Sequence, residues 1–157
     1  MTIKNQNTII LVLCYLVVFF LVLYNINNSF FWDTVVYGSN HSSFYWSTQF
    51  SNLLLPDNMD CGVIPAFGMY IALIWEIFGR SIQTSHLAML PFALGIVYQL
   101  YILSKKFIKP EFAGITSLLV LADPTILSQV TLVSPDVPLV FFFLLGTNSL
   151  IENKKAL

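Results

Sequence analysis

The polar loop Asn25 to Cys61 reads NINNSFFWDTVVYGSNHSSFYWSTQFSNLLLPDNMDC, and Ser134-Pro135-Asp136 is its distant counterpart. Most groups able to do chemistry gather in these two places, because the rest of the chain is mostly apolar. Asp33 lies in the loop soon after the first apolar segment, and Asp136 lies at the head of a later one. We therefore expect the apolar helices between them to bring the two acids to one side of the fold.

The composition places the chain among membrane proteins, with the lipid bilayer as its solvent. Hydrophobic residues make up 57% and charged residues 10%, against about 45–50% apolar and about 25% charged in soluble domains. The net charge of −1 excludes a nucleic-acid partner, which would require a basic stripe. Cys14 lies in an apolar run and Cys61 in the loop, so we expect no disulfide and find no cysteine spacing typical of a metal site.

The first apolar run extends from Ile9 to Tyr24 and predicts a transmembrane helix at about residues 8–25. The run is a little shorter than the roughly 20 residues that span a bilayer. A cleaved signal peptide is the alternative, since the run is only slightly longer than the apolar region of such peptides. We favour an uncleaved anchor, because the following Asn25-Ile26-Asn27-Asn28 is a poor cleavage site.

The outer loop, residues 26–84, contains two amphipathic pieces, at about 34–50 and 63–79. The basic residues decide whether the second piece crosses the membrane. If it crosses, only Lys4 and Arg80 face the cytoplasm; if it lies along the outer surface, six of the seven basic residues are cytoplasmic and Arg80 alone is outside. The second arrangement obeys the positive-inside rule. We therefore expect both pieces to be juxtamembrane helices.

Three further spans follow, at about residues 85–104, 112–133 and 137–151. Asp123-Pro124 interrupts the middle one, where Asp as N-cap and Pro at the first helical position would begin a resumed half-helix. The expected fold is all-α: a single polytopic module over residues 1–157, with four transmembrane helices and both termini in the cytoplasm.

This parity puts Asp33 and Asp136 on the same outer face. A carboxylate there can act as a general base toward a hydroxyl or amine, and a second can orient substrate or hold a cation. The structural alternative for Asp136 is the first turn of a helix that Ser134 caps with Pro135 at the first position, where the macrodipole favours a carboxylate. Asp33 would in the same way cap the piece at 34–50. His41 and His86 have no second ligand at a metal spacing, so we interpret them as interfacial polar residues and expect no metal cluster.

Three motifs follow an N-terminal anchor in a recognisable order: Trp32-Asp33-Thr34-Val35-Val36-Tyr37, Asp60-Cys61-Gly62-Val63-Ile64-Pro65 and Ser134-Pro135-Asp136-Val137-Pro138-Leu139. An aromatic segment ending Ile77-Phe78-Gly79-Arg80-Ser81 follows the second motif. This order resembles the N-terminal part of the C-type (GT-C) glycosyltransferases related to dolichyl-phosphate-mannose protein mannosyltransferases and aminoarabinose lipid A transferases. Members of that family continue with many more spans, so the resemblance implies the N-terminal portion of a longer enzyme.

The resemblance implies transfer of a sugar from a polyprenyl-phosphate donor to a protein or lipid acceptor on the outer membrane face. It makes Asp33 the catalytic acid and general base, and Asp136 a second acid near the sugar phosphate. For substrate contacts we expect Tyr37, Asp60 and Arg80. The implied location is the plasma membrane, with the bacterial inner membrane favoured, and a divalent cation is an optional cofactor.

Two positions depart from the family pattern. The family commonly has Asp-Glu where this chain has Asp33-Thr34, and Gly-His-Pro-Pro where it has Gly62-Val63-Ile64-Pro65. Loss of the second acid weakens a metal-bridging role. Two alternatives therefore stay open: a non-catalytic membrane subunit or remnant of such a transferase, and a transporter half, for which polar residues at mid-membrane are few.

Overall fold

The computed structural model describes residues 3–32, 34–59, 61–62 and 64–156, with the side chains of 6–153 in those ranges. All regular elements in the described residues are helical, which confirms the all-α fold class. The elements are α1 (Ile3–Tyr24), the π-helix η1 (Val35–Asn40), α2 (His41–Ser47), α3 (Ala66–Phe78), α4 (Ile82–Phe107), the 3-10 helix η2 (Pro110–Phe112), α5 (Ala113–Leu121), α6 (Pro124–Gln129) and α7 (Asp136–Ala156).

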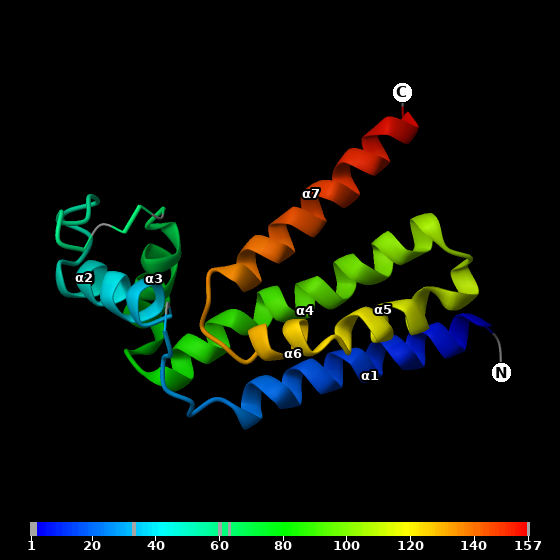
Figure 1. Ribbon diagram of the computed structural model, residues 1–157, viewed down its shortest axis with the longest axis horizontal. Helices are drawn as coiled ribbons and strands as arrows, with labels where there is room; N and C mark the ends of the chain where they lie inside the picture. Colours follow the sequence, from blue (N-terminus) through cyan, green and yellow to red (C-terminus); the bar gives the residue numbers. More distant parts are fainter. Residues whose placement is uncertain (1–2, 33, 60, 63, 157) are drawn as a thin grey trace.

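Helices α1, α4 and α5 lie side by side, and α7 leaves the bundle at an angle after packing on α4 (Figure 1). The described residues between 35 and 78 form a lobe at one end of the bundle, packed on α4 through α3, which we call the α2–α3 lobe. At the lobe end, α1 ends and both α4 and α7 begin; at the other end, α1 begins and α7 ends (Figure 1). The chain thus alternates direction through the bundle, which places the end of α1 and the starts of α4 and α7 at a common end.

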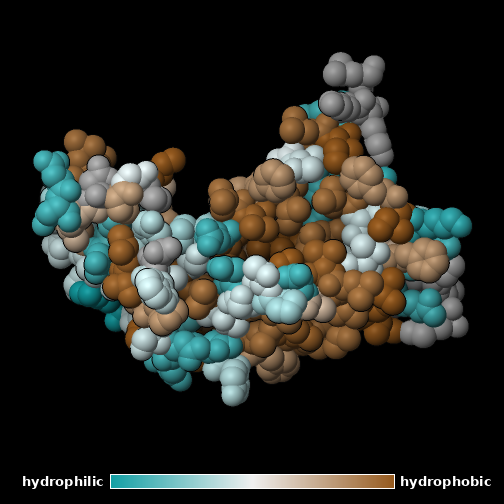
Figure 2. Space-filling model, viewed as in Figure 1, coloured by the Kyte–Doolittle hydropathy of each residue, from teal (hydrophilic) through white to brown (hydrophobic). Residues whose placement is uncertain are grey.

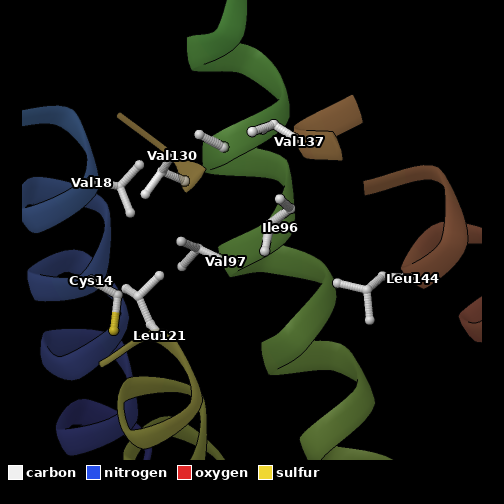
Figure 3. Close-up of a cluster of buried hydrophobic side chains, with 9 residues drawn as sticks. Cys14, Val18, Ile96, Val97, Leu121, Val130, Val137 and Leu144 are labelled. Carbon is white, nitrogen blue, oxygen red and sulfur yellow. The ribbon is translucent and has the colours of Figure 1, made fainter. Parts of the chain in front are cut away.

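The bundle core is built from small and branched side chains of five segments (Figure 3). Its buried members are Cys14, Val18, Ala93, Ile96, Val97, Leu121, Val130, Val137 and Leu144. Gly95 lets α7 approach α4 closely, because a β-carbon built there would lie 2.5 Å from the Phe141 ring. Below this contact the Asn148 Nδ2 donates to the Gln99 main-chain carbonyl at 3.0 Å and to Gln99 Oε1 at 2.8 Å, a polar link that fixes the register of α4 and α7.

Two helices in the described residues are long and apolar enough to cross a bilayer, Gln6–Tyr24 in α1 and Ile82–Phe107. Only 22% of the apolar window of α1 is buried inside the chain, so most of its apolar surface needs a non-aqueous neighbour. Figure 2 shows the same feature as a broad hydrophobic surface over the bundle. This apolar surface favours association of the chain with a membrane, because exposing it to water would cost free energy.

The structure refines the bounds predicted for the spans. The segment predicted at 112–133 is two short helices, α5 and α6, separated at Asp123. Asp123 is the N-cap of α6, since its Oδ1 accepts the Thr125 N–H at 2.8 Å, which confirms the predicted resumption at Pro124. The resumed helix ends at Gln129, short of the predicted residue 133.

The other three predicted spans are longer at their ends. Helix α1 begins at Ile3, where we predicted residue 8. Helix α4 begins at Ile82, because Ser81 caps it by accepting the Thr84 N–H at 3.0 Å, and it continues through Lys105 and Lys106. Helix α7 covers Asp136–Ala156, compared with a predicted 137–151.

The two predicted surface pieces form the α2–α3 lobe. The first becomes η1 and α2, and the second becomes α3, which lies across the end of the bundle (Figure 1). Gly68 allows α2 to cross α3 closely, since a β-carbon there would lie 2.6 Å from His41 Cβ and 3.2 Å from the His41 carbonyl carbon. Tyr70 joins the lobe to the bundle by donating its hydroxyl to the Ala88 carbonyl at 2.7 Å. Burial raises the pKa of Tyr70, so this hydroxyl stays a neutral donor.

Candidate functional site

The site begins where the lobe meets the segment that leads into α7. A β-carbon built on Gly38 would lie 3.1 Å from the Val133 carbonyl oxygen and 3.6 Å from the Phe30 ring. Phe30 and Gly38 stand on either side of Asp33 in the sequence, and Val133 is three residues before Asp136. The chain flanking the first predicted acid therefore contacts the chain flanking the second. Asp33 itself, like Asp60, lies outside the described residues.

The backbone around Asp33 has two uncommon conformations. Trp32 has φ of 49°, in the left-handed region that non-glycine residues rarely adopt. The π-helix Val35–Asn40 follows immediately, and such helices are rare and frequent at functional sites. Uncommon conformations of this kind cluster at functional sites.

Thr34 closes the turn beside Asp33. Its side chain is buried, and Thr34 Oγ1 both donates to the Phe31 carbonyl and accepts the Phe31 N–H, each at 2.7 Å. In the resembled family this position commonly carries an acid. Here the residue is threonine, which has no carboxylate to offer a metal or substrate, and its hydroxyl is used within the local turn.

Asp136 is the first residue of α7 and is exposed. Its N–H donates to Ser134 Oγ at 3.2 Å, and Ser134 is buried, so the predicted capping by Ser134 is confirmed. Asp136 also lies on the wall of an apolar cavity of about 140 Å³ between α4, α6 and α7, next to Val137 and Gln129. The Asp136 carboxylate lies in a first helical turn, as a structural role requires, and it is also accessible, as a role toward substrate requires.

Arg80 is held by the lobe. Its guanidinium lies 5.2 Å from the ring centroids of Trp46 and of Trp75, and it donates to Ser43 Oγ at 2.8 Å. The Trp75 Nε1 in turn donates to Ser85 Oγ at 2.8 Å. Stacking between two indoles fixes the planar cation while leaving it exposed. The predicted contact of Arg80 with substrate stays a prediction. In the structure, Arg80 contacts α2 through Ser43 and Trp46 and α3 through Trp75.

Tyr37 belongs to a polar cluster in the lobe. Its ring makes an edge contact with His41, with centroids 5.9 Å apart. His41 Nε2 lies 3.0 Å from the Met59 carbonyl oxygen and 3.7 Å from Cys61 Sγ. A cavity of about 210 Å³ lies against these groups and is also lined by Val36, Asn40 and Asn58. The cluster combines an imidazole, a thiol and two amide side chains at one opening.

Both histidines, which we interpreted as interfacial polar residues, are packed inside the described part of the chain. His41 and His86 are 1% and 3% exposed, and His86 Nε2 lies 3.0 Å from the Asn28 carbonyl oxygen. Each imidazole satisfies a loop carbonyl in a packed region. The proximity of His41 and Cys61 was missed, because the two residues are 20 positions apart and no regular spacing relates them.

The lysines gather at the opposite end of the bundle. Lys105 and Lys106 occupy the last turn of α4, and Lys109 follows the helix. Lys106 Nζ donates to the Asn148 carbonyl at 2.7 Å and pairs with Glu152 at 3.2 Å. The basic side chains are therefore unevenly distributed along the bundle. Among the described side chains, Arg80 is the basic one at the lobe end, and the lysines lie at the other end.

The described residues contain no group of three or more His, Cys, Asp or Glu side chains that could hold a metal ion. Cys14 is buried and Cys61 is exposed, and both are free, as expected. Comparison with protein-family models, with curated proteins and with solved structures finds no match to this chain.

Proposed function

We propose that the chain is a membrane glycosyltransferase module that moves a sugar from a polyprenyl-phosphate donor to a protein or lipid acceptor at the outer membrane face. In this proposal Asp33 is the general base and Asp136 orients the donor or acts as a second acid. Tyr37, Asp60 and Arg80 contact substrate, and a divalent cation is an optional component.

The observation that carries the proposal is the contact between Gly38 and Val133. It joins the polar loop to the Ser134-Pro135-Asp136 turn at one end of the bundle, which is the arrangement that two cooperating acids require. General acid–base work depends on such placement first and on proton affinity second. The strained Trp32 and the π-helix after Asp33 add local support.

The proposed topology has four membrane passages: α1, α4, α5 with α6, and α7. Helices α5 and α6 together make one passage, whose break at Asp123 is capped within the chain and is tolerated where the freed polar groups are satisfied. The lobe then lies on the outer face of a plasma membrane, with the bacterial inner membrane favoured, and the lysine end lies in the cytoplasm. This orientation satisfies the positive-inside rule.

A second candidate is a non-catalytic membrane subunit with the same fold. The observation that favours it is Thr34, whose buried hydroxyl is used in a turn at the position of a family acid. A chain that keeps the helices and loses the second carboxylate would still bind lipid or a partner subunit.

A transfer assay separates the two candidates. Membranes containing the protein would be incubated with a set of radiolabelled polyprenyl-phosphate sugars, followed by extraction of lipid and protein products. Transfer that depends on Asp33 supports the enzyme. Because the resembled enzymes continue with further spans, we expect no transfer from this chain alone, and the decisive assay supplies those spans or a partner. Transfer in that setting that is unchanged by Asp33→Asn would overturn the enzymatic proposal and favour the subunit.

A further inference from the structure

The segment 105–112 joins α4 to α5, and we call it the basic loop. Its Lys105 and Lys109 are exposed and form no ion pair, since the one ion pair found among the described side chains joins Lys106 to Glu152 at 3.2 Å. Lys105 is positioned by the Tyr101 ring, with its ammonium 5.4 Å from the ring centroid. The basic loop therefore offers positive charge that the chain itself does not neutralise.

Large apolar side chains accompany these lysines. Phe107 is 74% exposed and Phe112 is 51% exposed. Such rings would be unfavourable in water, whereas at a membrane surface they insert among the lipid tails while lysines stay at the level of the headgroups. Exposed lysines beside exposed aromatic rings, at the end of a helix long enough to cross the bilayer, fit an acidic membrane surface.

A groove beside the basic loop has room for a lipid tail. It lies between the start of α1 and the start of α5 and has a volume of about 390 Å³, within the range of about 300–1,000 Å³ typical of ligand pockets. Its walls are formed by Gln6, Ile9, Ile10, Glu111, Phe112 and Ile115. Ile9, Phe112 and Ile115 are each about half exposed, so the groove opens away from the bundle core.

The groove is already formed in the free chain, because Asn7 fastens the basic loop to α1. Asn7 is 6% exposed, its Nδ2 donates to the Pro110 carbonyl at 2.6 Å, and its Oδ1 accepts the Gly114 N–H at 3.1 Å. These bonds hold η2 and the start of α5 against the start of α1 (Figure 1). A ligand therefore meets a fixed surface and need not order the loop.

We propose that the basic loop and this groove bind one anionic phospholipid, with its headgroup against Lys105 and Lys109 and one acyl chain in the groove. Charge selects the headgroup, because these two ammonium groups exceed the single carboxylate of Glu111 on the groove wall. Lys4 adds to the positive charge of the same end, since it belongs to the first turn of α1. The proposal requires that this end lies at a membrane surface, and it uses none of the residues assigned to sugar transfer.

Native mass spectrometry of the full chain, released from a neutral detergent, counts the lipids that the chain retains. The chain would be titrated with equal amounts of phosphatidylglycerol and phosphatidylcholine that carry the same acyl chains. We expect one phosphatidylglycerol to be retained in preference to phosphatidylcholine. The preference should fall as salt is raised during the titration, because salt screens exposed charges. Soluble glycerol phosphate, which has the phosphate but no acyl chain, should not displace the lipid.

Variants of the basic loop test the headgroup contact. A lysine near an acidic lipid surface contributes about fivefold to binding. Replacing both by Lys105→Gln and Lys109→Gln should therefore raise the phosphatidylglycerol concentration needed for half-maximal retention by about 25-fold. Arg80→Gln is the control for Lys109→Gln, since it removes the same charge at the lobe end and should leave retention unchanged.

Variants of α5 test the acyl-chain contact. Ile115→Asn should weaken retention, because Ile115 lines the groove, whereas Leu119→Asn should not, because Leu119 is exposed outside it. Circular dichroism would establish that each variant is folded. Equal retention of the two lipids by the parent chain, or an unchanged preference in the double lysine variant, would overturn the proposal. Displacement by glycerol phosphate would assign the lysines to a free phosphate and would also overturn the lipid site.

Discussion

Gly38 lies against the main-chain carbonyl of Val133, so closely that a β-carbon at position 38 would be 3.1 Å from that oxygen. This contact couples the segment after Asp33 to the segment before Asp136, although α2, α3, α4, η2, α5 and α6 lie between them in the sequence. The contact is made by backbone and a glycine, so it depends on shape and tolerates little added volume.

Replacement of Gly38 by valine should destabilise the lobe end. Overpacking of a close contact costs about 1–3 kcal/mol, because Val133 or η1 must move to admit the new side chain. The measurement is the midpoint of thermal unfolding in detergent. Gly146→Val is the matched control, since a β-carbon at Gly146 meets no atom within 4 Å. Equal midpoints for the two variants would show that the Gly38 contact is not tight.

Topology can be read with cysteines placed at the two ends of the bundle. In a chain lacking Cys14 and Cys61, we expect a cysteine at Ser51 to react with an impermeant thiol reagent from outside, and one at Lys109 to react only after the membrane is opened. Both positions are exposed, so access depends on the side of the membrane and not on burial. Labelling of position 109 from outside would restore a membrane-crossing α3 and separate the two acids.

Short-range signals in the sequence predicted their elements well. Asp123-Pro124 was recognised as a cap and first turn because capping involves only neighbouring residues, and the Asp123–Thr125 hydrogen bond confirms it. The same holds for Ser134 ahead of α7. Helix ends were less well predicted, because the lysines of α4 and the asparagines of α1 are polar yet continue the helix.

Contacts between distant segments left no pattern in the sequence. His41 lies against Gly68 of α3 and near Cys61 of the loop before it, and α4 approaches α7 where Gly95 admits Phe141. Each is a consequence of packing that no spacing rule describes. The burial of His41 and His86 likewise left no pattern in the sequence.

The Gln99–Asn148 link should show strong coupling between its two partners. Replacing only Asn148 by leucine leaves Gln99 Oε1 without its donor in a buried place, a loss of about 1–3 kcal/mol. Replacing both residues by leucine removes the two polar groups together and should recover most of that loss. A double-mutant cycle on the unfolding midpoint measures the coupling. Additive effects would mean that the two amides do not depend on each other.

The two acids can be separated by their asparagine variants. Asn caps a helix about as well as Asp, so Asp33→Asn keeps any capping role while losing the ability to take a proton from an acceptor. Loss of a general base should lower the transfer rate by about 10²–10⁴. The measurement is the initial rate of sugar transfer in membranes with equal amounts of each protein.

Asp136→Asn should have a milder effect, because Asp136 already has a structural setting in the first turn of α7 beside Ser134. If Asp136 only orients the donor, its replacement should raise the donor concentration needed for half-maximal rate and change the maximal rate less. Asp123→Asn serves as the control, since Asp123 caps α6 through the Thr125 N–H, a role that Asn also fills, and should leave transfer unchanged. Full activity in Asp33→Asn with normal expression would reduce Asp33 to a structural residue and leave the proposed reaction without its base.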